Sequence, residues 1–383
     1  MLALFEPFSA AHRARSRRRS SSMAALALVV LWHPGVGRAG NSDYPTWSIN
    51  GFGTLGAVHS SDDQADFVSN PAQPKGAGYT AAWTATPDSK LGIQLNVDFT
   101  PRLSAVVQLL SQYQYDGTFR PELEWGNLKF KITPDVDIRA GRIAIPAYMF
   151  SDSLNIGYAL PFARIPAEID AQLPVSHSDG VDGSYRVHVG DATNTVQAYF
   201  GGFDTKLPNQ GDFATHDIRG MSDTIDYGSA TLHLSYQRLH YDLTFDGPPL
   251  SRMSQDLLSI GASYDPGKWY ASGEWIRVPD EAFGLFYGWY VDGGIRIGKL
   301  TPYGVYAHTY MSRVGEFGFP AFINQSTTTL GLRWDFMHNL DLKAQLDHTR
   351  LDGGFNQFFV NQQPGFQQIG TVNLVTVLID FVF

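Results

Sequence analysis

Cysteine is absent from all 383 residues of the sequence. A disulfide framework and a metal site with cysteine ligands are therefore excluded. Long apolar stretches are also missing, because beyond residue 40 there is no run of the about 20 apolar residues that a membrane-spanning helix needs. Charge is scarce as well. Charged residues make up 17% of the chain, the formal net charge is −9, and no basic cluster beyond the N-terminal region could hold nucleic acid.

Glycine and aromatic residues, by contrast, are plentiful. The sequence contains 38 Gly, 25 Phe, 18 Tyr and 8 Trp, and 43% of its residues are hydrophobic. Aromatic and β-branched side chains fit the pleated surface of a sheet, and glycine marks turns and bends. The composition therefore favours an all-β fold.

The N-terminal region differs from the rest of the chain. Arginines at positions 13–19 precede an apolar run of about ten residues (Met23–Trp32), and small residues follow at 37–39. This order predicts a cleaved signal peptide over residues 1–39 and a mature domain over residues 40–383. A membrane anchor is the alternative, but the apolar run is about half as long as a spanning helix requires. Cleavage would remove six arginines and one glutamate, so the mature chain would be more acidic than the whole.

The mature chain consists of segments of about ten residues that alternate between apolar and polar character. In residues 91–99 the odd positions are apolar, whereas Gln94, Asn96 and Asp98 are polar. Residues 340–347 alternate in the same way. Since successive side chains of a strand point to opposite faces, each segment predicts a strand with one apolar and one wet face.

The breaks between these segments are alternately short and long. The short breaks predict seven tight turns, the long breaks predict eight loops, and together they predict sixteen strands with both chain ends on the side of the turns. A soluble sandwich has no reason to sort its connections in this way, so the pattern predicts a transmembrane antiparallel up-and-down β-barrel. The short breaks lie at 100–101, 133–135, 191–193, 226–229, 265–267, 299–301 and 337–339, and the long ones near 60–90, 114–121, 144–180, 203–217, 242–255, 279–285, 313–325 and 351–370.

A closed ring is the form that such strands must take in a bilayer, because no water there can satisfy a free strand edge. Sixteen strands enclose a lumen wide enough for water. We therefore expect apolar side chains towards lipid, a polar inner wall, and aromatic girdles near the strand ends. The aromatic residues expected in these girdles are Trp47, Phe99, Trp269, Trp275, Tyr303, Phe381 and Phe383.

Three segments carry a resemblance to a known family. They are residues 48–56 (SINGFGTLG), 178–186 (SDGVDGSYR) and 375–383 (VTVLIDFVF). They resemble proteobacterial outer-membrane porins, and the resemblance covers essentially the whole mature chain. It implies a barrel in the outer membrane of a Gram-negative bacterium, a homotrimer, and a third loop that folds into the lumen. It also implies that Phe383 is the signal that the barrel-assembly machinery recognises.

The segment 144–180 is too long for a structureless connection, and loops of this length are usually functional. If it folds inward, as the resemblance implies, its charges would face basic residues of the wall across the narrowest section and set up a transverse field. The alternative is an external loop with solvated charges. The predicted constriction residues are Asp152, Arg164, Glu168 and Asp170, and the predicted basic wall residues are Lys129, Lys131, Arg139, Arg186, Arg296 and Arg333.

Three short motifs could indicate other chemistry. Residues 51–56 match the dinucleotide fingerprint G-x-G-x-x-G, but they lie within a predicted strand and open no helix, so strand glycines that ease curvature or packing are the better interpretation. Residues 177–179 (His-Ser-Asp) are the residue types of a catalytic triad, but consecutive side chains point apart. The aspartates within 62–66 could bind Ca²⁺, although such clusters are more often solvated. We therefore predict no catalytic residue, no cofactor and no metal ligand.

The leading hypothesis for function is a porin, a passive channel for small hydrophilic solutes whose selectivity is set by the third loop and the lumen charges. Three alternatives remain open at this stage. They are a substrate-specific uptake channel for small organic acids, sugars or similar solutes, a barrel enzyme, and an adhesion or structural barrel. The expected partners are outer-membrane lipid, two further copies of the chain, the barrel-assembly machinery and the solutes, but not nucleic acid.

Overall fold

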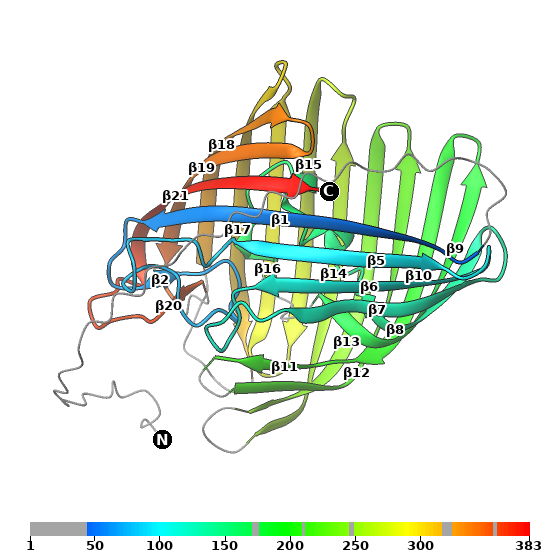
Figure 1. Ribbon diagram of the computed structural model, residues 1–383. Helices are drawn as coiled ribbons and strands as arrows, with labels where there is room; N and C mark the ends of the chain where they lie inside the picture. The colour runs from blue at the N-terminus through cyan, green and yellow to red at the C-terminus, as the bar shows by residue number, and fades with distance from the viewer. Residues whose placement is uncertain (1–43, 171–175, 209–210, 245–248, 316–323, 355–357) are drawn as a thin grey trace. The chain divides into compact units, whose positions relative to one another are not determined.

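The computed structural model describes residues 44–170, 176–208, 211–244, 249–315, 324–354 and 358–383. Over these residues the chain is mostly β-strand, and one antiparallel sheet closes into a barrel (Figure 1). The predicted signal peptide, residues 1–39, lies outside the described residues. The sixteen long strands of the wall are β1 (Thr46–Ser60), β5 (Lys90–Asp98), β6 (Leu103–Gln112), β7 (Glu122–Lys131), β8 (Val136–Ala144), β9 (His177–Val189), β10 (Ala192–Gly202), β12 (Gly211–Tyr227), β13 (Ala230–Thr244), β14 (Leu250–Tyr264), β15 (Trp269–Asp280), β16 (Gly284–Ile295), β17 (Leu300–Val314), β18 (Asn324–Met337), β19 (Leu340–Asp352) and β21 (Ile369–Val382).

The barrel closes where the first and last strands pair. β1 runs antiparallel to β21 on one side, with Leu55 opposite Ile379, and to β5 on the other, with Gly53 opposite Leu91. Each of the sixteen long strands therefore has two paired neighbours. Closure of this kind satisfies the backbone donors and acceptors of the wall without water, as a bilayer requires.

The connections alternate between short turns and long loops, as predicted. The turns that join β5 to β6, β7 to β8 and the five later pairs contain two to four residues and lie at one end of the barrel. Both described chain ends lie at that same end, because Thr46 is opposite Asp98 and Phe383 is hydrogen-bonded to Gly51. The predicted sixteen strands, seven turns and eight loops are confirmed.

Four short strands of the described chain lie at the loop end of the barrel, in the connections of the first and last long strands. β2 (Asp66–Phe67), β3 (Ala77–Gly78) and β20 (Phe359–Val360) form a separate small sheet that joins the β1–β5 connection to the β19–β21 connection. β4 (Trp83–Thr84) pairs with β1 in the large sheet.

One predicted loop proves to be largely strand. Residues 203–217 were expected to form a long loop, but β11 (Asp204–Leu207) pairs with the start of β12. The ring of Phe213 stacks on Phe203 and on Tyr241, with centroid distances of 5.7 and 4.6 Å. This aromatic stack lies on the inner face and keeps the two strands paired beyond the expected break.

The side chains of the wall sort by parity as the alternation predicts. On β19, Leu346 faces outward and is 49% exposed, whereas Asp341 and Lys343 face inward and are fully buried. Of the expected girdle residues, Trp47, Phe99, Trp269 and Phe383 are exposed. The expectation for Tyr303 is wrong. It faces inward with its ring over Gly331, and its hydroxyl donates to Gln345 Oε1 at 2.9 Å, because tyrosine has a polar end that the inner wall can satisfy.

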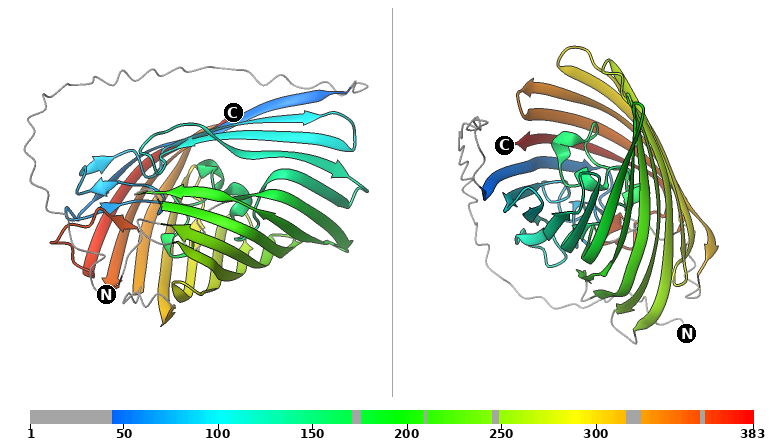
Figure 2. Two further views of the ribbon diagram at one scale, coloured as in Figure 1. Left: turned by 90° about the horizontal axis from the view of Figure 1, so that it is seen from below. Right: turned by 90° about the vertical axis from the view of Figure 1, so that its right-hand side faces the viewer.

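The described helical segments all belong to the connection between β8 and β9. They are the 3₁₀ turns η1 (Ser151–Ser153) and η2 (Gly157–Ala159) and the single α-helical turn α1 (Ala167–Asp170). Figure 2 shows them inside the ring of strands. Among the described residues, no helix has the length and apolar character needed to cross a membrane.

Candidate functional site

The described part of the connection between β8 and β9 (residues 145–170 and 176), which we call the inner loop, packs against the inner wall of the barrel. Its side chains Tyr148, Phe162 and Ile169 are buried in one cluster with inward-facing wall residues such as Leu257 and Tyr290. The rings of Phe162 and Tyr290 meet edge to face at a centroid distance of 6.3 Å. The segment that the sequence predicted to fold inward therefore does so, because its apolar side chains find partners only inside.

Hydrogen bonds fix the first half of the inner loop to one side of the wall. The hydroxyl of Ser235 on β13 donates to the carbonyl oxygen of Ala147 at 2.6 Å. The backbone N–H of Met149 donates to Glu274 Oε1 on β15 at 2.9 Å. These bonds satisfy buried polar groups of both partners, so the loop has a defined position along the wall.

A second set of bonds fixes η2 to a part of the wall further along the ring. Arg333 on β18 donates through Nη1 to the carbonyl oxygens of Tyr158 and Leu160, at 2.9 and 3.0 Å. Lys343 on β19 donates through Nζ to the carbonyl oxygen of Gly157 at 2.7 Å. The inner loop is thus attached to the inner wall both at β13–β15 and at β18–β19.

The ammonium group of Lys343 is also part of a fully buried ion pair. Its Nζ lies 2.9 Å from Asp380 Oδ2, and the side chains of both residues have no exposed surface. The hydroxyl of Thr54 donates to the other carboxylate oxygen of Asp380. Asp380 was not singled out from the sequence, although its place on the inward parity of an otherwise apolar last strand was a usable signal.

Arg164 is a largely enclosed charge of the inner loop. Its guanidinium donates to both oxygens of Asp88, at 3.0 and 2.7 Å, and to Asp347 Oδ2 at 3.0 Å. It also donates to the hydroxyl of Thr376 and lies over the ring of Phe67, 5.1 Å from the centroid. Burial alone would lower the pKa of Arg164, but the two carboxylates raise it above its ordinary value. Arg164 therefore stays charged and ties the inner loop to β19, β21 and the β1–β5 loop.

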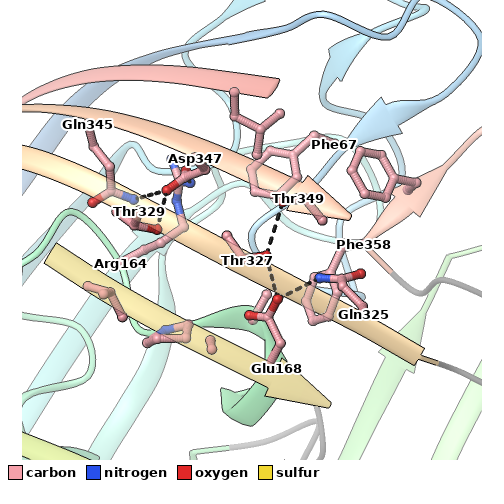
Figure 3. A pocket seen from close by; sticks show the side chains of 16 residues that line it. Phe67, Arg164, Glu168, Gln325, Thr327, Thr329, Gln345, Asp347, Thr349 and Phe358 are labelled. Carbon is pink, nitrogen blue, oxygen red and sulfur yellow. Dashed lines mark hydrogen bonds and ion pairs between the residues drawn. The ribbon is translucent and has the colours of Figure 1, made fainter. Parts of the chain in front are cut away.

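Glu168 is buried beside this group, on α1. Its Oε1 accepts from Gln325 Nε2 at 2.8 Å and from the hydroxyl of Thr327 at 2.5 Å, both on β18 (Figure 3). Thr327 is in turn 3.0 Å from the hydroxyl of Thr349 on β19. Burial raises the pKa of Glu168 despite these two donors, which lower it. Asp170, the last residue of α1, has a side chain outside what the structure describes.

A small cavity of about 40 Å³ separates this part of the inner loop from the wall, which is room for a few water molecules. Figure 3 shows how Arg164 and Glu168 approach it from the loop while Asp347 and Gln325 approach from the strands. Aromatic rings of the loop end complete the lining. They are Phe67, Phe358 and Phe359.

Asp152 occupies a different environment from Arg164 and Glu168. It lies in η1, is exposed, and interacts electrostatically with Arg139 on β8 and with His233 on β13. Arg139 is itself held by Asp182 on β9, which it contacts through Nε at 2.9 Å. Asp152 is therefore an exposed charge of the inner loop that interacts electrostatically with Arg139 of the wall.

The other predicted wall residues fall into two groups. Lys129 pairs with Asp137 at 2.9 Å, and Arg333 contacts Asp335 and Asp341 at 2.9 and 3.0 Å, so both lie on the inner wall. The remaining predicted residues lie near the short-turn end and are exposed. They are Lys131, Arg186 and Arg296, the last of which pairs with Asp265 at 2.6 Å.

The motifs that could indicate other chemistry do not form sites. Residues 51–56 lie within β1, as the strand interpretation predicted. His177 lies 3.6 Å from Glu124, Ser178 bonds to a backbone carbonyl, and Asp179 pairs with Arg142 at 2.7 Å, so the three side chains do not converge as a triad requires. Among the described residues there is no cluster of three or more His, Cys, Asp or Glu side chains that could hold a metal ion.

Comparison with known proteins gives a likeness in fold. No sequence family model and no curated protein sequence matches the chain. The outer membrane channel DcaP of Acinetobacter baumannii is similar with a TM-score of 0.59 at 11% identity, covering 88% of this chain and 97% of that one. The anion-selective porin from Comamonas acidovorans is similar with a TM-score of 0.57 at 13% identity, covering 89% and 100%. The trimer form of OmpT, an outer membrane protein of Vibrio cholerae, has a TM-score of 0.58 at 12% identity, covering 89% and 100%. The chain therefore has the porin-type barrel fold.

Proposed function

We propose that this protein is a porin of the Gram-negative outer membrane, in which small hydrophilic solutes diffuse passively through the barrel. The observation that carries the proposal is the closed sixteen-stranded wall with lipid-compatible side chains outside and ionised side chains inside. Ionised groups are tolerated inside a water-filled lumen, whereas Arg or Lys on the lipid face costs about 2–4 kcal/mol at mid-bilayer. The likeness in fold to a channel and to an anion-selective porin supports the same proposal.

The inner loop would provide the narrow section of this channel. In this proposal Asp152 on the loop and Arg139 on the wall face each other across the open part of the lumen, and the field between them orients dipolar solutes. Arg164 and Glu168 would contribute indirectly, because their buried contacts hold the loop in place. Selectivity would then depend on exposed charges near η1 more than on the enclosed ones.

The remaining parts of the proposal concern assembly. Residues 1–39 would direct export and be removed, and Phe383 at the end of the last strand would be the signal for the barrel-assembly machinery. A homotrimer is proposed because the trimer form of an outer membrane protein from Vibrio cholerae shares the fold. Neither catalysis nor a cofactor enters the mechanism, because diffusion through a water-filled lumen needs neither.

Conductance in planar lipid bilayers tests the proposal. The purified folded protein should produce stepwise current increases in salt solution, each corresponding to the insertion of one assembly. The same preparation unfolded by heating before addition is the control. A folded protein that gives no current above the lipid background would show that the lumen is plugged and that the barrel has another function.

A substrate-specific channel is the second candidate, because charged side chains of both signs lie on the inner face of the wall, as a site for one class of solute requires. Such a channel should show current that saturates with solute concentration and is blocked by competing solutes. Current proportional to concentration would favour the general porin.

A further inference from the structure

The outer surface of β12–β15 changes from apolar to charged at one level. Along each of these four strands the outward residues nearest the short turns are mostly apolar, such as Leu232 and Leu234 on β13 and Ile260 on β14. Towards the loops, the outward residues Met221, Tyr236, Leu258 and Trp275 are followed by Arg219, Arg238, Asp256 and Arg277. We call these four charged residues the outer arginine patch.

The patch faces away from the lumen. Arg219 pairs across the ladder with Arg238, and Arg238 pairs with Asp256, so the three side chains share one face. Their neighbours on the opposite parity point inward and are buried, as Gln237 and Leu257 show with exposed fractions of 1% and 0%. The patch is therefore not part of the channel wall.

The positive charge of the patch is only partly compensated. Arg238 donates to both oxygens of Asp256, at 2.5 and 2.8 Å, and the hydroxyl of Tyr236 lies 3.2 Å from the same carboxylate. Glu281 also interacts electrostatically with Arg238. Arg219 and Arg277, in contrast, form no ion pair or side-chain hydrogen bond with any residue in the described part of the chain, and Arg277 interacts with Asp256 only through longer-range electrostatics. Two guanidinium groups are thus free to take an anion from outside.

The position of the patch indicates the chemistry of that anion. Arginine is unfavourable in the hydrocarbon region and tolerated at its border, and tyrosine and tryptophan are typical of that border. Tyr236 and Trp275 adjoin the patch on the side of the apolar band, so the arginines lie at the level of the lipid headgroups. They lie on the side of the long loops, which in barrels of this kind is the external side. The anions available there are lipid phosphates, whose planar, bidentate recognition suits arginine.

We propose that Arg219, Arg238 and Arg277 bind the phosphate of an anionic lipid headgroup in the external leaflet. Asp256 orients Arg238, and the lipid phosphate neutralises the two guanidinium groups that have no partner. The inference rests on the proposed location of the barrel in the outer membrane, but it does not require that the barrel conduct. It concerns the outer surface alone.

Binding of lipid A to the full-length folded protein tests the proposal. Detergent-purified protein is titrated with bisphosphorylated lipid A and with the dephosphorylated form, and bound lipid is counted by native mass spectrometry. The double variant Arg219→Ala/Arg277→Ala should bind the bisphosphorylated form about 25-fold more weakly, from about fivefold for each arginine. The matched control Arg102→Ala/Lys268→Ala removes two exposed charges at the opposite end and should bind like the unchanged protein.

Three results would overturn the proposal. The first is equal binding of bisphosphorylated lipid A by the unchanged protein and by Arg219→Ala/Arg277→Ala, and the second is equal binding of the phosphorylated and dephosphorylated forms. The third is the formation of a disulfide-linked dimer by Tyr236→Cys in membranes, because the chain has no other cysteine and such a link would place a second copy on the patch. Single-channel conductance of the double variant should equal that of the unchanged protein, so failure of the lipid proposal and failure of the channel proposal remain distinguishable.

Discussion

The ring of Phe383 lies directly over Gly51, at the seam where the first and last strands close the barrel. The backbone N–H of Gly51 donates to the carbonyl oxygen of Phe383 at 2.8 Å, and the reverse bond measures 2.9 Å. A Cβ atom at position 51 would lie 2.1 Å from Cζ of Phe383. The first glycine of the G-x-G-x-x-G motif thus gives space to the terminal aromatic residue.

Substitution Gly51→Ala should destabilise the closed barrel by about 1–3 kcal/mol, because the ring of Phe383 must move to accommodate the methyl group. Urea unfolding in detergent micelles, followed by tryptophan fluorescence, measures the effect. Gly183→Ala is the matched control, since its Cβ would be no closer than 3.8 Å to the nearest atom. Equal urea midpoints for the two variants would show that the contact between Gly51 and Phe383 has no role in closure.

Substitution Arg164→Ala should loosen the inner loop. It leaves Asp88 and Asp347 buried without their partner, and the loss of one member of a buried ion pair costs about 3–5 kcal/mol. We expect noisier single-channel current and a shift of selectivity towards cations, because a positive charge is lost. Arg296→Ala, which breaks an exposed pair, is the control. If the current noise and the reversal potential of Arg164→Ala equal those of the unchanged protein, Arg164 neither holds the loop nor influences ion selectivity in the lumen.

Substitution Asp152→Lys should shift the reversal potential in a salt gradient towards anion selectivity. The reason is that an exposed negative charge facing Arg139 is replaced by a positive one at the proposed narrow section. Asp116→Lys makes the same change of charge in the exposed β6–β7 loop and should leave the reversal potential close to its original value. If both variants shift it equally, the effect comes from total charge and not from a constriction at η1.

The attachment of the inner loop should weaken as the pH rises. Burial raises the pKa of Glu168 above its ordinary value of 4.5, so the folded state prefers the protonated carboxyl. The contribution of Glu168 to the stability of the folded state is fully present below pH 4.5. It is lost as the pH rises through the raised pKa of Glu168. Unfolding midpoints measured at increasing pH, starting below the ordinary pKa of 4.5, should fall for the unchanged protein relative to Glu168→Gln. Glu122→Gln, on an exposed side chain, should follow the unchanged protein. Parallel curves for Glu168→Gln and the unchanged protein would contradict the role of Glu168.

Part of the candidate site followed from the sequence and part did not. The length of segment 144–180 and the resemblance to outer-membrane porins predicted an inward fold, and the buried side chains of this segment confirm it. The distinction between the exposed Asp152 and the enclosed Arg164 could not be predicted. Arg164 finds Asp88 and Asp347, which lie 76 and 183 residues away along the chain, and nothing in the local pattern brings these three together.

The sequence by itself determined the number of strands, the two ends of the barrel and the facing of most wall residues. These properties depend on local chemistry, since the alternation of side chains in a strand and the length of each break are read within about ten residues. Only the tertiary structure decided which charges are paired and buried, that Tyr303 faces inward, and that Gly51 lies under Phe383. These depend on contacts across the lumen and across the seam, which exist only after the ring has closed.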